Sequence, residues 1–216
     1  KHGWPPFGVI TWTLVRLFLV RLAILKIEPR KLDGDWAEGW ALDIHTLKSV
    51  PLDEGRFDTI YPEVGKALHQ LKYENDWNQL TPLAVAVSEF LKGRIWIKSI
   101  DVIVPVPPSE RRVRQPVQEL ADSVGNLLDI SVSHDYLQKI KRTKSLKAEG
   151  DPMRRKQELA GAFVVADGRY AGKNILLLDD IYRSGVTLQE ITGVLRNSGG
   201  AVRVYVQTLT KTRTKR

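Results

Sequence analysis

The chain has 216 residues, of which 43% are hydrophobic and 27% charged. This length favours one domain with an elaboration over two domains, and the balance of residues excludes a wholly disordered chain. The absence of cysteine excludes a disulfide scaffold, a thiolate zinc site and a cysteine nucleophile. Lysine and arginine outnumber aspartate and glutamate by 33 to 25, so the net charge of +8 favours anionic partners: phosphorylated metabolites, nucleic acid or a membrane surface.

The segment from Phe7 to Ile27 is almost wholly apolar and about as long as a membrane span. Arg16 and Arg21 interrupt it, and each central charge costs about 3 kcal/mol on the insertion scale. We therefore disfavour a membrane span and expect a packed helix or an interaction arm that supports a homodimer. A membrane-surface segment is the alternative. The expected location is cytoplasmic, with surface association through residues 7–27 left open.

Short elements are predicted in the first half of the chain. Residues 29–35 have the composition of a polar linker, and the partial alternation over 36–52 predicts two short strands. Pro62 at a helix start and the apolar spacing after it predict an amphipathic helix to Tyr73. A second helix is expected over 81–91.

The second half alternates strand and helix patterns. β-Branched or apolar runs predict strands at 100–106, 130–136, 175–178 and 202–209, with helices at 115–128 and 187–197. Such alternation is typical of an α/β fold with a parallel sheet flanked by helices.

The most informative stretch is 175–187, where an apolar strand leads into Asp179 and Asp180, then into a short loop and a helix. Open α/β sheets bind ligands outside the carboxyl ends of their strands. The loop 183–187 offers hydroxyls and backbone N–H groups at a helix N-terminus, and Gly185 permits a close approach, as phosphate binding requires. Two carboxylates suit vicinal sugar hydroxyls. The alternative is a capped helix after a strand with two exposed acids.

This stretch resembles the signature of type I phosphoribosyltransferases, which use 5-phosphoribosyl pyrophosphate (PRPP). Leu71–Tyr73, Asp101–Pro107 and Gly161–Phe163 are similar, in the same order, to the ComF family. The resemblance implies a type I phosphoribosyltransferase-like parallel sheet flanked by helices, with a small hood and, in this chain, an extra apolar N-terminal arm. The implied division is an arm at 1–30, a hood or strand segment at 31–56, a phosphoribosyltransferase-like domain at 57–210 and a basic tail at 211–216.

The resemblance also implies roles for individual residues. Asp179 and Asp180 would contact the ribose hydroxyls and would hold Mg²⁺ indirectly, through those hydroxyls or water. The 5-phosphate would be held by Arg183, Ser184, Gly185, Val186 and Thr187. The pyrophosphate would lie at the turn formed by Val106, Pro107 and Pro108, with Arg111 and Arg112. The catalytic residues would be Asp179, Asp180 and Arg142, the last in a basic segment over 139–161.

Two groups of residues each have two interpretations. Arginines at 111, 112 and 114 could fork onto phosphate oxygens or be solvated after a proline-capped helix start. Four aromatic residues could stack on an acceptor base or belong to the core: Trp36, Trp40, Tyr136 and Phe163.

The function implied is transfer of a phosphoribosyl group from PRPP, with Mg²⁺, to a nitrogenous base or amine, with release of pyrophosphate. The acceptor has no recognisable sequence pattern. The alternative is a ComF-like nucleic-acid-handling or regulatory protein, in DNA uptake or processing, that keeps the PRPP site without turnover. That alternative predicts weak binding of single-stranded nucleic acid.

Overall fold

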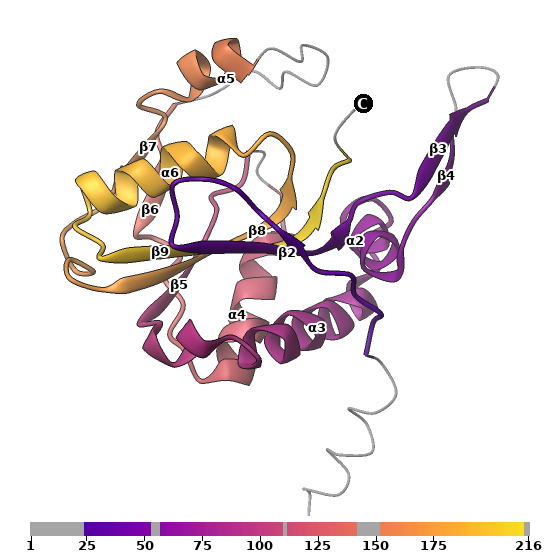
Figure 1. Ribbon diagram of the computed structural model, residues 1–216, viewed down its shortest axis with the longest axis horizontal. Coiled ribbons are helices and arrows are strands. Elements are labelled where there is room, and N and C mark those ends of the chain that lie inside the picture. The colour runs from indigo at the N-terminus through magenta and orange to yellow at the C-terminus, as the bar shows by residue number, and fades with distance from the viewer. Residues whose placement is uncertain (1–23, 53–56, 110–111, 142–151, 214–216) are drawn as a thin grey trace, which may run out of the picture.

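The computed structural model describes residues 24–52, 57–109, 112–141 and 152–213, and its centre is a five-stranded sheet (Figure 1). The strands in spatial order are β1 (Arg30–Lys31), β2 (Glu38–Ile44), β9 (Arg203–Lys211), β8 (Asn174–Tyr182) and β5 (Val102–Pro105). Neighbouring strands are parallel except β1 and β2, which are antiparallel. The predicted α/β class with a mostly parallel sheet is confirmed.

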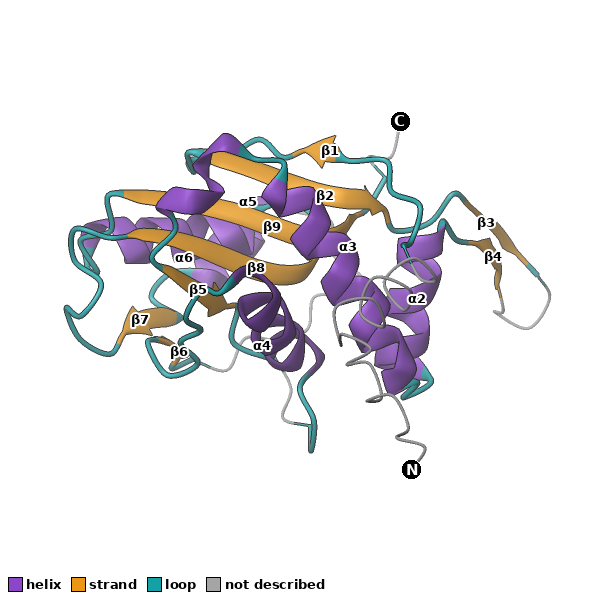
Figure 2. Cartoon of the chain, turned by 90° about the horizontal axis from the view of Figure 1, so that it is seen from below, coloured by secondary structure: helices purple, strands orange, loops and turns teal. Residues whose placement is uncertain are grey.

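Helices cover both faces of this sheet (Figures 1 and 2). One face carries α2 (Glu63–Tyr73), α3 (Leu80–Lys92) and α4 (Pro116–Leu128), and the other carries α6 (Val186–Asn197). Strand β8 shows why both faces are needed. Leu176 and Leu178 pack into the core on the α2–α4 side, whereas Ile175 and Leu177 pack on the α6 side, and all four are fully buried. A strand covered on both faces is a continuous apolar run, as this one is.

The four helices expected from the sequence are present in α2, α3, α4 and α6. Two short 3₁₀ helices, η2 (Trp77–Gln79) and η3 (Ile95–Ser99), flank α3. Helix α4 begins with Pro116 in its first turn, where the missing N–H costs nothing.

Two small sheets lie outside the central one. Strands β3 (Lys48–Pro51) and β4 (Phe57–Ile60) form a hairpin that projects from the body of the molecule (Figure 1). Strands β6 (Leu137–Lys139) and β7 (Phe163–Val165) form an antiparallel pair, and α5 (Pro152–Leu159) packs against α6.

The two strands expected over 36–52 exist, but the placement of the first one in the hood was wrong. This strand, β2, pairs in parallel with β9, with Ala41 opposite Thr208, and belongs to the central sheet. Ala41 and Leu42 are fully buried on its opposite faces, so this strand is part of the core. The expected linker over 29–35 also contains β1.

The strand expected over 130–136 was largely wrong. Only Val132 pairs with the central sheet, through a single parallel bridge to Ile103. The polar residues that follow find local partners instead: the Ser133 hydroxyl donates to Asp135, whose carboxylate accepts two bonds from Arg169. These contacts turn the chain toward β6.

Residues 1–23 lie outside the described residues, so most of the apolar arm does too. Where the described chain begins, Leu25 and Ile27 pack against the core, and the Lys26 N–H donates to Glu63 Oε2 at 2.7 Å. Within the described ranges, no helix has the length and hydrophobicity needed to cross a bilayer.

Candidate functional site

Asp179 and Asp180 lie near the carboxyl end of β8, at the edge where the other parallel strands also end. Strand β8 continues to Tyr182, so the acids are the sixth and seventh residues of the strand and do not follow it, as the sequence had suggested. Asp179 pairs in register with Thr208 of β9. Pairing of β8 with β9 therefore fixes the backbone positions of both aspartates.

The Asp180 carboxylate is held by a lysine from a distant segment. Lys72, in the last turn of α2, places its Nζ 2.5 Å from Asp180 Oδ2. Both side chains are only 17% exposed. The ammonium supplies the positive charge that two adjacent carboxylates need, and it occupies the oxygen expected to accept a sugar hydroxyl.

Asp179 is positioned by the backbone. The N–H of Asp180 donates to Asp179 Oδ1 at 2.9 Å, which fixes the side chain of this half-buried residue. Burial, followed by the charge of Asp180, raises the pKa of Asp179 well above its usual range, although Lys72 and Arg183 oppose the shift. The two acids are therefore chemically different: one is ion-paired and the other resists ionisation.

The loop after β8 presents backbone donors beside these acids. Gly185 is buried, has a φ of 77° and immediately precedes α6. No described side chain caps this helix start, so its first N–H groups are free to bind an anion. Arg183 and Ser184 are exposed next to it, and Thr187 is half-buried. The predicted phosphate loop, residues 183–187, therefore connects the end of β8 to the start of α6.

The turn after β5 approaches the acids from another strand. The N–H of Val106 donates to the Leu178 carbonyl at 2.9 Å, which ties this turn to β8. Pro107 is half-buried and Pro108 exposed. The guanidinium of Arg112 donates to the backbone carbonyl of Lys72 at 2.9 Å, so a second basic side chain reaches the end of α2. Arg111 lies outside the described residues.

Arg114 serves a different purpose from a phosphate contact. Its guanidinium donates to both carboxylate oxygens of Glu119, and it lies 3.6 Å from the ring centre of Trp77. These contacts join the start of α4 to η2. Arg114 is therefore neither freely solvated nor directed at a phosphate, and both alternatives for this residue were wrong.

His45, which sequence reasoning left without a role, also lies near the acids. It follows β2, and its Nδ1 shares a hydrogen bond with the Thr210 hydroxyl at 3.1 Å. Burial, then the positive charges of Arg183 and Lys72, lowers its pKa, which favours the neutral ring. No sequence pattern singled it out. Lys72 belongs to the segment Leu71–Tyr73, which resembles the ComF family, but that resemblance gave it no role.

The basic segment over 139–161 is described only at its two ends, and Arg142 lies outside the described residues. The N–H of Gly161 donates to Glu190 of α6 at 3.2 Å, which anchors the returning end. The four aromatic residues considered for base stacking belong to the core. Trp36, Tyr136 and Phe163 are buried, and Trp40 packs edge-on against Phe90.

The donor set fits a magnesium ion held mainly by substrate. In the described ranges, no three histidine, aspartate or glutamate side chains gather as a metal site, but Asp179 and Asp180 offer two hard carboxylates. Mg²⁺ commonly uses one or two carboxylates together with substrate phosphates and waters.

No protein-family model matches the sequence, and no curated protein matches it either. Among solved structures, the chain is similar to adenine phosphoribosyltransferase from Trypanosoma brucei in complex with AMP, pyrophosphate and ribose-5-phosphate (12% identity, 84% of this chain and 73% of that one, TM-score 0.46). The enzyme of the same name from Saccharomyces cerevisiae gives 12% identity, 77% and 84% coverage, and a TM-score of 0.46. Glutamine PRPP amidotransferase from B. subtilis gives 17% identity and a TM-score of 0.42 over 70% of this chain, which spans only 28% of that enzyme.

Proposed function

We propose that this protein binds PRPP and transfers its phosphoribosyl group to a nitrogenous acceptor, with release of pyrophosphate. The observation that carries the proposal is the position of the Asp179–Asp180 pair. The pair lies near the carboxyl end of a buried parallel strand, with an uncapped helix start after it and the side chains of Lys72 and Arg112 at the end of α2. A sugar with an anionic group at each end fits such an arrangement.

Each part has a task in the proposed reaction. The loop 183–187 binds the 5-phosphate through backbone N–H groups and hydroxyls. Asp179 and Asp180 accept hydrogen bonds from the ribose hydroxyls and orient the ring. Arg112, with Val106, Pro107 and Pro108, faces the pyrophosphate, whose departure from C1 leaves an oxocarbenium-like carbon for the nitrogen to attack. Positioning and charge neutralisation supply most of the rate.

Mg²⁺, when bound, would neutralise the departing pyrophosphate, with Asp179 and Asp180 holding it through the ribose hydroxyls or water. Arg142 and Arg111 complete the proposed catalytic and binding sets on the strength of the family resemblance. The same resemblance supports placing the chain in the ComF-like group of type I phosphoribosyltransferases.

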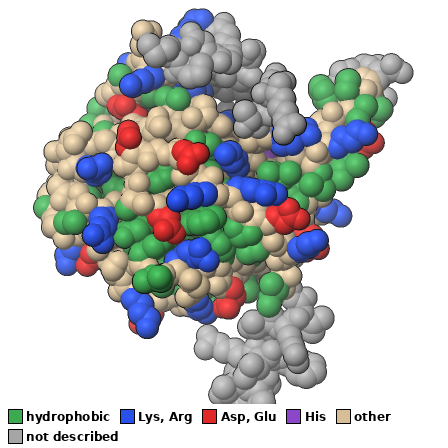
Figure 3. Space-filling model, in the orientation of Figure 1, with side chains coloured by type: hydrophobic (Ala, Val, Ile, Leu, Met, Phe, Trp, Pro, Cys, Tyr) green, Lys and Arg blue, Asp and Glu red, His purple; other side chains and the backbone are tan. Residues whose placement is uncertain are grey.

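A second candidate is a nucleic-acid-handling or regulatory protein that binds PRPP without turnover. Its support is the net charge of +8. On the face shown in Figure 3, basic side chains are interspersed with acidic ones, which fits weak rather than tight binding of single-stranded nucleic acid. PRPP binding without pyrophosphate release for any of a panel of bases, together with salt-dependent oligonucleotide binding, would favour this candidate.

The test is a thermal shift with PRPP and Mg²⁺, followed by a pyrophosphate-release assay. A ligand at a hundred times its Kd adds about 2.7 kcal/mol of stability. The double variant Asp179→Asn with Asp180→Asn should lose most of that shift. A control that removes two carboxylates elsewhere, Asp135→Asn with Asp167→Asn, should keep it. An undiminished shift in the first variant would refute the site.

A further inference from the structure

The ion pair between Lys72 and Asp180 places a cation where the proposed substrate must bind. The 2.5 Å contact uses Asp180 Oδ2, one of the oxygens that would accept a ribose hydroxyl. A carboxylate oxygen engaged this closely by an ammonium is a poor acceptor for a new hydroxyl. A ribose hydroxyl and the Lys72 ammonium therefore compete for this oxygen.

Moving Lys72 is costly unless the ligand offers it a new partner. Both side chains are largely buried, at 17% exposure, and separating them without compensation leaves a cation and an anion unpaired in a poorly solvated place. A ligand that carries its own anion beside α2 removes this cost, because the ammonium exchanges one oxygen partner for another.

The position of Lys72 specifies which end of the sugar must carry that anion. Its backbone carbonyl is held by Arg112 from the turn after β5, whereas the 5-phosphate loop lies at the start of α6. The fixed carbonyl anchors the main chain, and the four-carbon stem of lysine lets the ammonium swing from Asp180 toward a group bound beside Arg112. That group is the one at the anomeric carbon.

We propose that Lys72 is a specificity-determining residue that guards Asp180 in the free protein and releases it only to a sugar phosphate carrying a second anionic group at its anomeric carbon. The proposal rests on the proposed function and adds a selectivity device to it. It explains how the site would reject ribose 5-phosphate, which has the same hydroxyls and 5-phosphate but gives Lys72 no replacement partner.

Calorimetric titration with two probes, PRPP with Mg²⁺ and ribose 5-phosphate, tests this assignment. Lys72→Met should weaken PRPP binding by about tenfold to a hundredfold, the value of a hydrogen bond to a charged group. The same change should leave ribose 5-phosphate binding unchanged or tighter, because the competing ammonium is gone. The ratio of the two Kd values should therefore fall by at least about tenfold.

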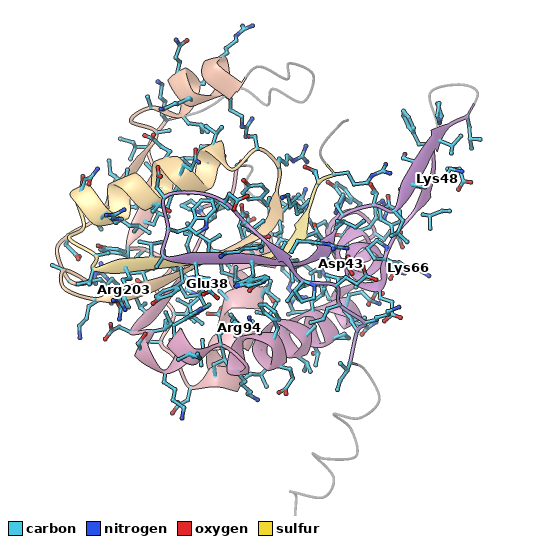
Figure 4. The ribbon with its side chains drawn as sticks, viewed as in Figure 1. Glu38, Asp43, Lys48, Lys66, Arg94 and Arg203 are labelled. Carbon is cyan, nitrogen blue, oxygen red and sulfur yellow. The ribbon has the colours of Figure 1, made fainter. Side chains whose placement is uncertain are left out.

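The matched control is Lys66→Met, which removes an exposed lysine from the same helix (Figure 4) and should leave both Kd values unchanged. A second neutral variant, Lys72→Gln, can still donate to Asp180 and keeps the test valid if the methionine variant does not fold. If the ion pair were merely structural, Lys72→Met would weaken the binding of PRPP and of ribose 5-phosphate by the same factor. That result would overturn the proposal. If the unaltered protein binds neither probe, the proposed function itself fails.

Discussion

The hydroxyl of Tyr182 lies where a side chain on Gly185 would have to begin: a β-carbon at 185 would sit 2.6 Å from it. Tyr182 is itself fixed, since its hydroxyl donates to the Asp33 carbonyl at 3.3 Å and its ring meets Trp36 edge-on. The φ of 77° at Gly185 is also one that other residues adopt only with strain. The loop before α6 therefore requires glycine at position 185 for two independent reasons.

Gly185→Ala should destabilise the protein by about 1–2 kcal/mol through the left-handed backbone alone, with a further loss as Tyr182 is displaced. It should also reduce the PRPP-dependent thermal shift, because the loop N–H groups move. Urea denaturation with and without ligand measures both effects. Gly193→Ala is the control: this position is inside α6 with nothing within 4 Å, so alanine should stabilise by about 0.5–1 kcal/mol. Full stability and unchanged binding in Gly185→Ala would contradict this account.

Asp179→Asn should stabilise the ligand-free protein at neutral pH while impairing PRPP binding. The amide keeps an oxygen to accept the Asp180 N–H, so mainly the charge is lost. Because the folded-state pKa of Asp179 is raised, the folded protein binds its proton more tightly than the unfolded chain, and its contribution to stability falls as pH rises above about 4. The advantage of the variant should therefore be absent at acidic pH and grow toward neutrality.

The opposite slope is expected for Asp101→Asn. The Asn174 N–H, then Lys173, lowers the pKa of Asp101, so its ionised form stabilises the fold and this variant should be less stable at neutral pH, the difference disappearing as pH falls. Denaturant midpoints measured from about pH 2 to 8 separate the two cases, because the difference for Asp101 is lost only below about pH 4. Parallel curves for both variants would refute the electrostatic difference.

Arg114→Met should lower the melting temperature slightly and leave PRPP affinity unchanged, because Arg114 contacts Glu119 and Trp77 rather than the site. Arg112→Met should leave the melting temperature unchanged and weaken PRPP binding, since Arg112 is exposed and reaches the end of α2. Calorimetry on both variants, with melting curves, makes the comparison. If PRPP affinity fell in Arg114→Met and not in Arg112→Met, Arg114 would be the ligand contact and this prediction would be wrong.

Local pattern predicted much of the site because its key parts are contiguous. The apolar run of β8, the two acids and the glycine loop lie within thirteen residues, 175–187, so strand, carboxylates and helix start could be inferred together. The contact between Lys72 and Asp180 could not. It joins residues 108 positions apart and depends on how α2 packs against the sheet.

The errors in the fold have the same origin. Alternation over 36–52 correctly predicted strands, but which sheet a strand joins depends on a partner far away in sequence, here β9. Over 130–136, two β-branched positions imitated a strand. The polar residues that follow form local bonds, such as that of the Ser133 hydroxyl with Asp135 at 3.2 Å, which compete with sheet pairing.

The position of β9 between β2 and β8 has a consequence for biosynthesis. Strand β2 leaves the ribosome early, yet its parallel partner consists of residues 203–211, which are made about 160 residues later at about 5–20 residues per second. Until then β2 has no parallel partner, and such non-local parallel pairing is slow to form. The nascent chain therefore spends roughly ten seconds or more with an open sheet, a period in which chaperone binding would protect it from aggregation.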